Sequence, residues 1–218
     1  EGDDWISFLV EKSNYNERST LVVSNDHDIK QLLTYSLGPN FINIMSNEMQ
    51  SRQKIFLPKN YQMFLNHLDK NNVEDIFNLN DNQEFIKFMK FFIDRYEINE
   101  VDSMECLIIK IISGDTSDNI TSCWSQVKNG KKRGIAEKGA KSIFDEYLIN
   151  FGEPKITDPD LTENIADLIC EKKKLPKNKI FDIKKNIEYN MKLIYLDTKN
   201  FPYEIINKMN EIYIESEN

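Results

Sequence analysis

Residues 19–33 read STLVVSNDHDIKQLL, and this stretch decides the fold class. Its first part, Ser19 to Val23, is a short β-branched run that is typical of a buried strand. Asp26 and Asp28 follow directly, and Ile29 to Leu33 then suggests a helix. A strand, an acidic loop and a helix in succession indicate an α/β fold, in which sites lie at the carboxyl ends of the strands.

The sequence on either side of this stretch predicts further strands and helices. Trp5–Lys12 has helical spacing, and two weaker strands are expected at Phe41–Met45 and Lys54–Leu57. From about Asn60 to Ile112 the pattern is helical, whereas Ser122–Arg133 is polar and basic and is expected to be a mobile loop. Later helices are expected at Gly139–Leu148, Thr162–Lys173, Asn178–Tyr189 and Pro202–Ile214.

The composition is that of a soluble globular protein. The 218 residues are 40% hydrophobic and 29% charged, and no apolar run approaches the roughly 20 residues that a membrane span requires. The three cysteines, Cys106, Cys123 and Cys170, are odd in number and far apart, which argues against structural zinc and for a reducing compartment. We therefore expect a cytoplasmic protein that has no membrane partner.

The net charge of −8 argues against nucleic-acid binding when it is taken alone. Two features weaken this argument. Bound cations would cancel part of the acidic charge. The basic residues are also clustered, first at Lys128, Lys131, Lys132 and Arg133, and again at Lys172, Lys173, Lys174, Lys177 and Lys179.

Three acidic clusters are candidates for chemistry: Glu1 with Asp3 and Asp4, then Asp26 with Asp28, and Asp115 with Asp118. Hard divalent cations take oxygen ligands, and two such ions roughly 3.5–4 Å apart can activate water and stabilise both oxygens of a phosphodiester displacement. Converging acids would repel each other without cations. The alternative is that each cluster is a helix cap or a turn, because Asp is preferred in both positions.

Four segments resemble, in order, the motifs of the 5′-nuclease superfamily of flap endonucleases and 5′–3′ exonucleases. They are EGDDWISFLVEK from Glu1, the stretch quoted above, ISGDTSDNI from Ile112 and RGIAEKGA from Arg133, and Tyr189–Asp197 is similar to a later family segment. The branch it resembles most is the RNase H type of T-even phages. The resemblance implies a PIN-like domain with a parallel sheet over residues 1–120, with a helical insertion at 58–100. A helical DNA-binding region with a helix-three-turn-helix would follow over residues 121–218.

The resemblance also implies a site. Its catalytic and metal-binding acids would be Glu1, Asp3, Asp26, Asp28, Asp115 and Asp118, with Asp4 as a further metal-site residue. They would hold two Mg²⁺ ions, for which Mn²⁺ can substitute. The helix-three-turn-helix would hold duplex phosphates, in relatives often with K⁺, and the implied nucleic-acid-binding residues are Lys131, Lys132, Arg133, Gly134, Ala136, Lys138, Gly139 and Lys141. The family's second glycine is here replaced by Ala136.

The implied activity is hydrolysis of RNA primers or 5′ flaps during phage DNA replication, in the host cytoplasm. Expected partners are branched, flapped or primer-bearing DNA, RNA/DNA duplexes and replication proteins such as a single-strand binding protein or a sliding clamp. The family's first strand, with another metal-binding Asp, and its basic arch would precede Glu1, so we expect residues 1–218 alone to have weak or no activity. Alternatives are a non-catalytic duplex-binding module, a PIN-type ribonuclease and a purely structural protein.

Overall fold

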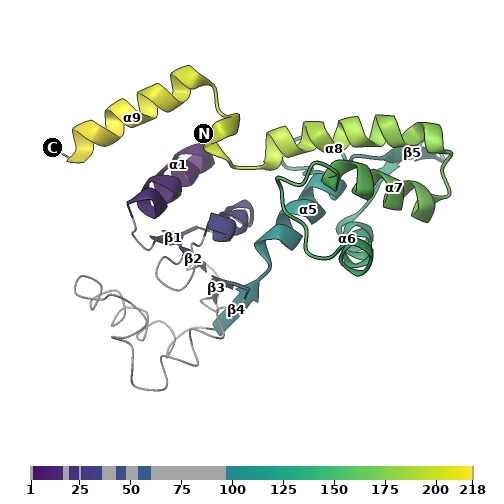
Figure 1. Ribbon diagram of the computed structural model, residues 1–218, viewed down its shortest axis with the longest axis horizontal. Helices are drawn as coiled ribbons and strands as arrows, with labels where there is room; N and C mark the ends of the chain where they lie inside the picture. Colours follow the sequence, from purple (N-terminus) through teal and green to yellow (C-terminus); the bar gives the residue numbers. More distant parts are fainter. Residues whose placement is uncertain are drawn as a thin grey trace. The chain divides into compact units, whose positions relative to one another are not determined.

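The computed structural model describes residues 2–16, 20–24, 26–35, 43–47, 54–59 and 97–217. The chain divides into two compact units, Glu1–Ser103 with Leu196–Asn218 (unit 1) and Met104–Tyr195 (unit 2). Figure 1 labels their helices and strands. The sequence predicts a different division at residue 120, between a nuclease domain and a DNA-binding region. That division is one of expected function, and it stays a prediction. None of the helices in the described residues is long and apolar enough to cross a membrane.

Unit 1 contains a four-stranded sheet in the order β1-β2-β3-β4, formed by β1 (Thr20–Val23), β2 (Asn43–Asn47), β3 (Lys54–Pro58) and β4 (Glu97–Val101). The pairs β1–β2 and β3–β4 are parallel, but β2 and β3 are antiparallel. The expected fully parallel sheet is therefore not what the structure shows. The connection from β2 to β3 is only residues 48–53, and a parallel pair needs a crossover of about a dozen residues or more.

Two further expectations for unit 1 change. The helical pattern expected through residues 58–100 is wrong at its end, because Glu97–Val101 forms strand β4. Ile98 and Val101 lie among polar residues there, so the segment has no apolar stripe of helical spacing. Residues 60–96, which hold most of that expected insertion, lie outside the described residues. The helix expected after Asp28 is a 3₁₀ helix, η1 (Asp28–Tyr35).

The C-terminal segment of unit 1 is fastened to the N-terminal helix α1 (Gly2–Tyr15). It comprises a short 3₁₀ turn, η3 (Thr198–Asn200), and helix α9 (Tyr203–Glu217). The hydroxyl of Ser7 donates to the carbonyl of Leu196 at 2.6 Å, and the N–H of Leu196 donates to Gln31 Oε1 at 2.9 Å. The rings of Phe8 and Tyr213 meet edge to face at 6.2 Å. The backbone of Leu196 therefore provides hydrogen-bond partners for two buried polar side chains, Ser7 and Gln31.

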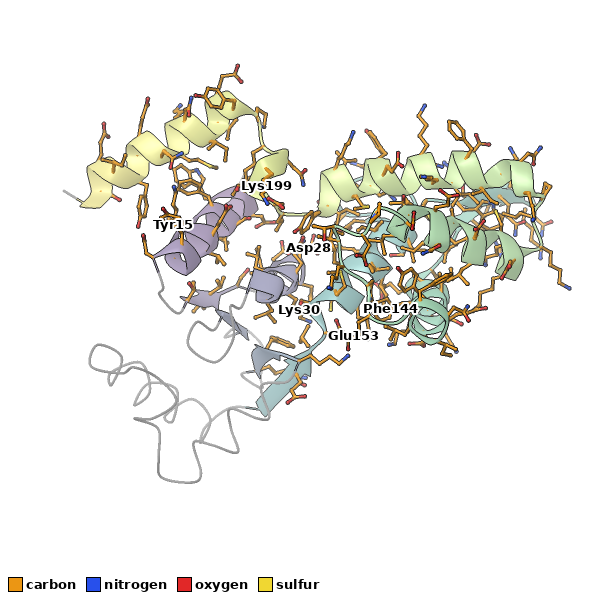
Figure 2. The ribbon with its side chains drawn as sticks, in the orientation of Figure 1. Tyr15, Asp28, Lys30, Phe144, Glu153 and Lys199 are labelled. Carbon is orange, nitrogen blue, oxygen red and sulfur yellow. The ribbon has the colours of Figure 1, made fainter. Side chains whose placement is uncertain are left out.

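Unit 2 is a helical bundle. Its helices are α5 (Ser103–Ser113, which starts at the last residue of unit 1), α6 (Glu137–Phe151), α7 (Leu161–Lys173) and α8 (Ile180–Ile194), with a 3₁₀ turn, η2 (Lys177–Lys179), before α8. Their apolar faces form one core, which contains Ile112, Phe144 (Figure 2), Ile169 and Ile187. All four helices were expected from sequence spacing, with ends that differ by a few residues.

The segment Ser122–Arg133 is not a loop but contains a β-hairpin. Strands β5 (Ser125–Lys128) and β6 (Lys131–Gly134) pair antiparallel around Asn129 and Gly130, which have φ angles of 54° and 72°. Asn-Gly with two positive φ angles is the preferred two-residue hairpin turn. Because β6 rather than a helix precedes the turn into α6, the expected helix-three-turn-helix is not formed as such.

Candidate functional site

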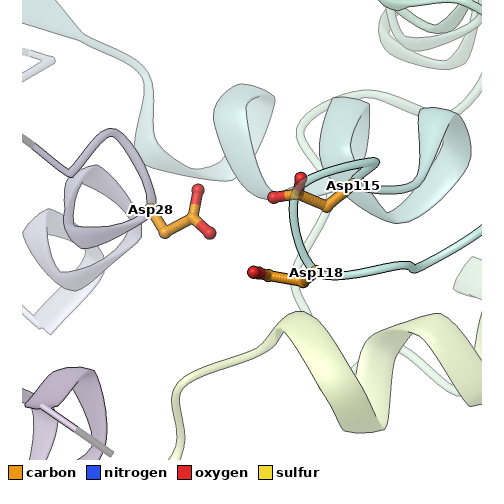
Figure 3. A group of neighbouring side chains, drawn as sticks. All are labelled: Asp28, Asp115 and Asp118. Atoms are coloured by element: carbon orange, nitrogen blue, oxygen red, sulfur yellow. The ribbon is translucent and has the colours of Figure 1, made fainter.

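A tight acidic loop follows α5 in unit 2. Gly114 ends the helix at a φ of +74°, and a Cβ there would lie 2.5 Å from the carbonyl oxygen of Ile120. Asp115 and Ile120 bond to each other through both backbone N–H groups, at 2.9 and 2.7 Å. Glycine is therefore required at 114, because the backbone of the returning chain occupies the space of a side chain. Figure 3 shows Asp115 and Asp118 on this loop.

Asp115 is held as a carboxylate by its neighbours. Its burial opposes ionisation, but hydrogen bonds from Lys110 and from both the side chain and the backbone N–H of Ser117 outweigh this and lower the pKa of Asp115 to about 2. The Lys110 Nζ lies 2.5 Å from Asp115 Oδ2, and the Ser117 N–H donates to Oδ1 at 2.9 Å. Asp115 is consequently charged at any physiological pH and fixed in one orientation.

The donor set of this loop fits a hard cation. Asp118 is exposed, and an oxygen of its carboxylate lies within 4.8 Å of one of Asp115. A carboxylate has about four lone-pair directions, so Asp115 retains acceptor capacity beside Lys110 and Ser117. Two carboxylates with room for water and phosphate oxygens suit Mg²⁺, which is usually bound through one or two protein acids.

Two asparagines of α8 hold the ends of the acidic loop. Asn190 is 3% exposed, and its Nδ2 donates to the carbonyls of Ile111 and Thr121, each at 2.9 Å. One turn earlier, Asn186 Nδ2 donates to the carbonyl of Cys123 at 2.9 Å. Because Ile111 precedes the loop and Thr121 follows it, Asn190 closes the loop at its base. The sequence placed Asn190 inside a family-like segment but gave it no role.

The base of the hairpin is joined to the same loop. The backbone N–H of Ile135 donates to Ser122 Oγ at 3.0 Å, and this oxygen also lies 2.9 Å from the carbonyl oxygen of Ile112. A Cβ at Gly134 would lie 2.5 Å from the Cβ of Ser122, so glycine permits this close approach. Between loop, hairpin and α6 lies a cavity of about 630 Å³, and its lining includes Asp115, Thr116, Asn119, Lys132, Ile135 and Glu137.

The nucleic-acid-binding residues expected from the sequence fall in different settings. Lys131, Lys132 and Arg133 are exposed on β6, and Lys138 is exposed in the first turn of α6. Lys141 is instead ion-paired with Glu105 at 2.7 Å and Asp145 at 2.9 Å, and these contacts outweigh its burial and raise its pKa. Gly134 ends β6, Ala136 accepts the N–H groups of Gly139 and Ala140, and Gly139 lies against Ile135.

The cysteine nearest the loop offers no nucleophile. Cys123 is fully buried, and its N–H donates to the carbonyl of Ile112 at 3.1 Å. Burial raises the pKa of the Cys123 thiol to about 12, so the group is protonated at neutral pH. Only the thiolate is an effective nucleophile. The chemistry available at this loop is therefore that of carboxylates and hydroxyls.

The acids of unit 1 lie at the starts of two helices. Asp3 and Asp4 are in the first turn of α1, and Asp28, labelled in Figures 2 and 3, begins η1. Asp26 Oδ1 accepts the backbone N–H of Asp28 at 2.8 Å, an Asx-type turn just before η1, whose first helical carbonyl acceptor is His27. Glu1 lies outside the described residues. That these acids share a site with Asp115 and Asp118 stays a prediction.

No family model matches the chain. The structure is similar to that of a mutant T5 5′-exonuclease, with 16% sequence identity and a TM-score of 0.49. The match covers 99% of this chain and 65% of the exonuclease chain.

Proposed function

We propose that this chain belongs to a metal-dependent 5′-nuclease that hydrolyses phosphodiesters at or near a 5′ end. The observation that carries the proposal is Asp115, a carboxylate held ionised and oriented on a tight loop with Asp118 exposed on the same loop. The cavity beside it is lined by Lys132 and by backbone and hydroxyl groups, which are suitable partners for a phosphate. The order of sequence motifs supports the same class.

The proposed metal site brings together the acids of the separate sequence motifs. Asp115 and Asp118 would share two Mg²⁺ ions with Glu1, Asp3, Asp26 and Asp28, with Asp4 as a further metal-site residue. So many converging carboxylates repel one another unless cations lie between them. Mn²⁺ would substitute, because it takes the same oxygen ligands.

The bound ions would supply a nucleophile from water and stabilise the charge on the attacking and leaving oxygens. The residues of the chain would hold these ions and the substrate in place. Asp115 is kept deprotonated by Lys110 and Ser117, so it offers an oxygen ligand without losing a proton. Asn190 and Gly114 keep the loop in one shape. Lys131, Lys132, Arg133 and Lys138 would hold substrate phosphates, and Gly134, Ala136, Gly139 and Lys141 would shape the entry to α6, where K⁺ is a further candidate.

The substrates in this proposal are 5′ flaps, primer-bearing or branched DNA and RNA/DNA duplexes. Its setting is phage DNA replication in the host cytoplasm, beside a single-strand binding protein or sliding clamp. Within the superfamily we place it with the RNase H type of T-even phages. The PIN-like architecture and the roles of residues 1–120 and 121–218 belong to the same proposal, and sequence motifs are its support.

A 5′-flap cleavage assay tests the proposal. The chain is assayed in Mg²⁺ and in EDTA, together with its Asp118→Asn variant and, as a matched control, its Asp160→Asn variant. Asp160 is exposed in the same unit, and its side chain makes no cap hydrogen bond. We expect weak metal-dependent cleavage that Asp118→Asn abolishes and Asp160→Asn leaves unchanged. Cleavage that is absent in every form, or insensitive to Asp118→Asn, would refute the proposal.

A non-catalytic duplex-binding module is the second candidate. The observation in its favour is that Asp115 already has a cationic partner, Lys110. In that case no form would cleave the flap substrate, and the duplex would still be bound without metal and regardless of Asp118→Asn. A PIN-type ribonuclease would instead show a preference for single-stranded RNA in the same assay.

A further inference from the structure

The β5–β6 hairpin has two chemically different faces. Residues directly opposite each other on paired strands share a face, as do residues two apart along one strand. The register pairs Lys128 with Lys131 and Gln126 with Arg133, and alternates these pairs with Val127–Lys132 and Ser125–Gly134. One face, here called the basic face, therefore consists of Gln126, Lys128, Lys131 and Arg133.

The basic face is uncompensated by acids. All four of its residues are exposed. Residues 119–136 contain no Asp or Glu, although the whole chain has a net charge of −8. Within the described part of the chain, the three cations of this face form no ion pair. By contrast, Lys141, Lys172, Lys179 and Lys184 in the same unit are each paired with an acid.

The arrangement also opposes the stability of the hairpin itself. Lys128 and Lys131 are directly opposite, and like charges in that position are destabilising. A two-stranded hairpin with both strands exposed is marginal even without such repulsion. The cations are thus not explained by the packing of the hairpin, and an anionic ligand would remove the repulsion.

We propose that the basic face of the hairpin binds the phosphate backbone of duplex nucleic acid. This inference rests on the proposed function, to which it adds a specific duplex-gripping element. Lys131 and Arg133 lie two residues apart, roughly 7 Å along the strand, and Lys128 lies beside Lys131, so the charges form a compact cluster. Such contacts position a duplex without reading its sequence.

The composition of the face favours a duplex over other polyanions. Proteins that bind single strands generally stack bases on aromatic side chains, and the basic face has none. Surfaces that bind membranes combine cations with apolar groups on the same side, whereas the exposed Val127 points to the opposite face. The contact of Gly134 with Ser122 ties the base of the hairpin to the acidic loop, so a bound duplex would be held in unit 2 beside Asp115.

The salt dependence of binding tests this inference. Affinity of the full chain for a blunt DNA duplex is measured in EDTA, without cleavage, between 50 and 200 mM salt. A triple variant combines Lys128→Gln, Lys131→Gln and Arg133→Gln. Each neutralised phosphate contributes about 0.9 to the slope of log affinity against log salt, so the slope should become shallower by about 2.7. Between 50 and 200 mM salt, the ratio of the parent's affinity to the variant's affinity should therefore fall about 40-fold.

The control removes the same charge elsewhere in unit 2, through Lys155→Gln, Lys185→Gln and Lys192→Gln, all exposed. Its slope should match that of the parent. The hairpin variant should melt at the parent's temperature or above it, because the Lys128–Lys131 repulsion is gone. An unchanged slope, an equal effect of the control, or a loss of binding to phosphatidylserine vesicles in place of DNA would overturn the inference. Because the binding assay contains no metal, it tests duplex binding alone. A failure of the nuclease proposal would be seen in the flap assay instead.

Discussion

The side-chain amide of Asn190 donates two hydrogen bonds, one to a carbonyl that precedes the acidic loop and one to a carbonyl that follows it. Its side chain is buried, and the hydrogen bond to the Ile111 carbonyl is buried as well, so that carbonyl would lack a partner if the amide were removed. We predict that Asn190→Leu lowers the free energy of unfolding by about 2–4 kcal/mol, because an unsatisfied buried group costs about 1–3 kcal/mol. Urea unfolding measures this.

The control for this variant is Asn186→Leu, one turn away on α8. Asn186 is exposed and bonds one carbonyl, that of Cys123, so its loss should cost under about 1.5 kcal/mol. If the loop is what Asn190 positions, Asn190→Leu should also weaken Mn²⁺ binding in protein that is still folded. Equal costs for the two variants, with Mn²⁺ binding unaffected, would show that Asn190 is an ordinary core residue.

A comparison of Gly114 with Gly130 distinguishes the cost of backbone strain from the cost of a steric clash. Both have φ near +70°, but a Cβ at 114 would strike the backbone at 2.5 Å, whereas nothing lies within 4 Å of one at 130. Gly130→Ala should cost about 1–2 kcal/mol from the left-handed conformation alone. We predict a clearly larger cost for Gly114→Ala in thermal or urea unfolding, with loss of metal binding. A similar cost at both sites would mean that the loop relaxes freely.

The sequence identified some of these residues and not others, for a physical reason. Asp115 and Asp118 lie in a motif of acids after an apolar helix, which is a local signal. Lys110 and Ser117, which set the charge state of Asp115, are ordinary helix and turn residues whose role depends on contacts with the loop. The role of Asn190 depends on how α8 packs on α5, 79 residues away, and no local pattern reports that.

At the scale of elements, the C-terminal segment depends on its attachment to α1. We predict that Ser7→Ala removes the hydrogen bond to the Leu196 carbonyl and speeds amide hydrogen exchange across α9 (Tyr203–Glu217) more than across β1. The stability cost should be about 1–3 kcal/mol, because the carbonyl loses a buried partner. Ser13→Ala, on the same helix and less buried, is the control. Unchanged exchange in α9 would mean that contacts such as Phe8–Tyr213 suffice.

Element prediction succeeded where periodicity was long and failed where it was short. The helices of unit 2 were expected because each repeats an apolar stripe over three or more turns. The hairpin was missed because its strands are only four residues long and carry exposed cations, although Asn129-Gly130 was a readable turn signal. Strand β4 was missed because it adjoins a long helical pattern.

At the scale of the whole molecule, residue patterns predict the mixed α/β class but not the division into the two compact units. Unit 1 takes its last residues, Leu196–Asn218, from the far end of the chain. Such a return is decided by long-range contacts such as those of Leu196 with Ser7 and Gln31, which spacing does not reveal. The acids proposed as metal ligands are consequently divided between the two units, with Asp28 in one and Asp115 and Asp118 in the other.

The central claim, that the acids of separate sequence motifs hold the same metal ions, has a direct test. Fe²⁺ replaces Mg²⁺ at the site, and ascorbate with peroxide then generates radicals that cut the backbone beside the bound iron. We predict cuts near Asp28 and also within residues 114–118, both suppressed by excess Mg²⁺ and both weakened by Asp118→Asn alone. Cuts confined to one of these segments, or insensitive to Mg²⁺, would contradict the shared site.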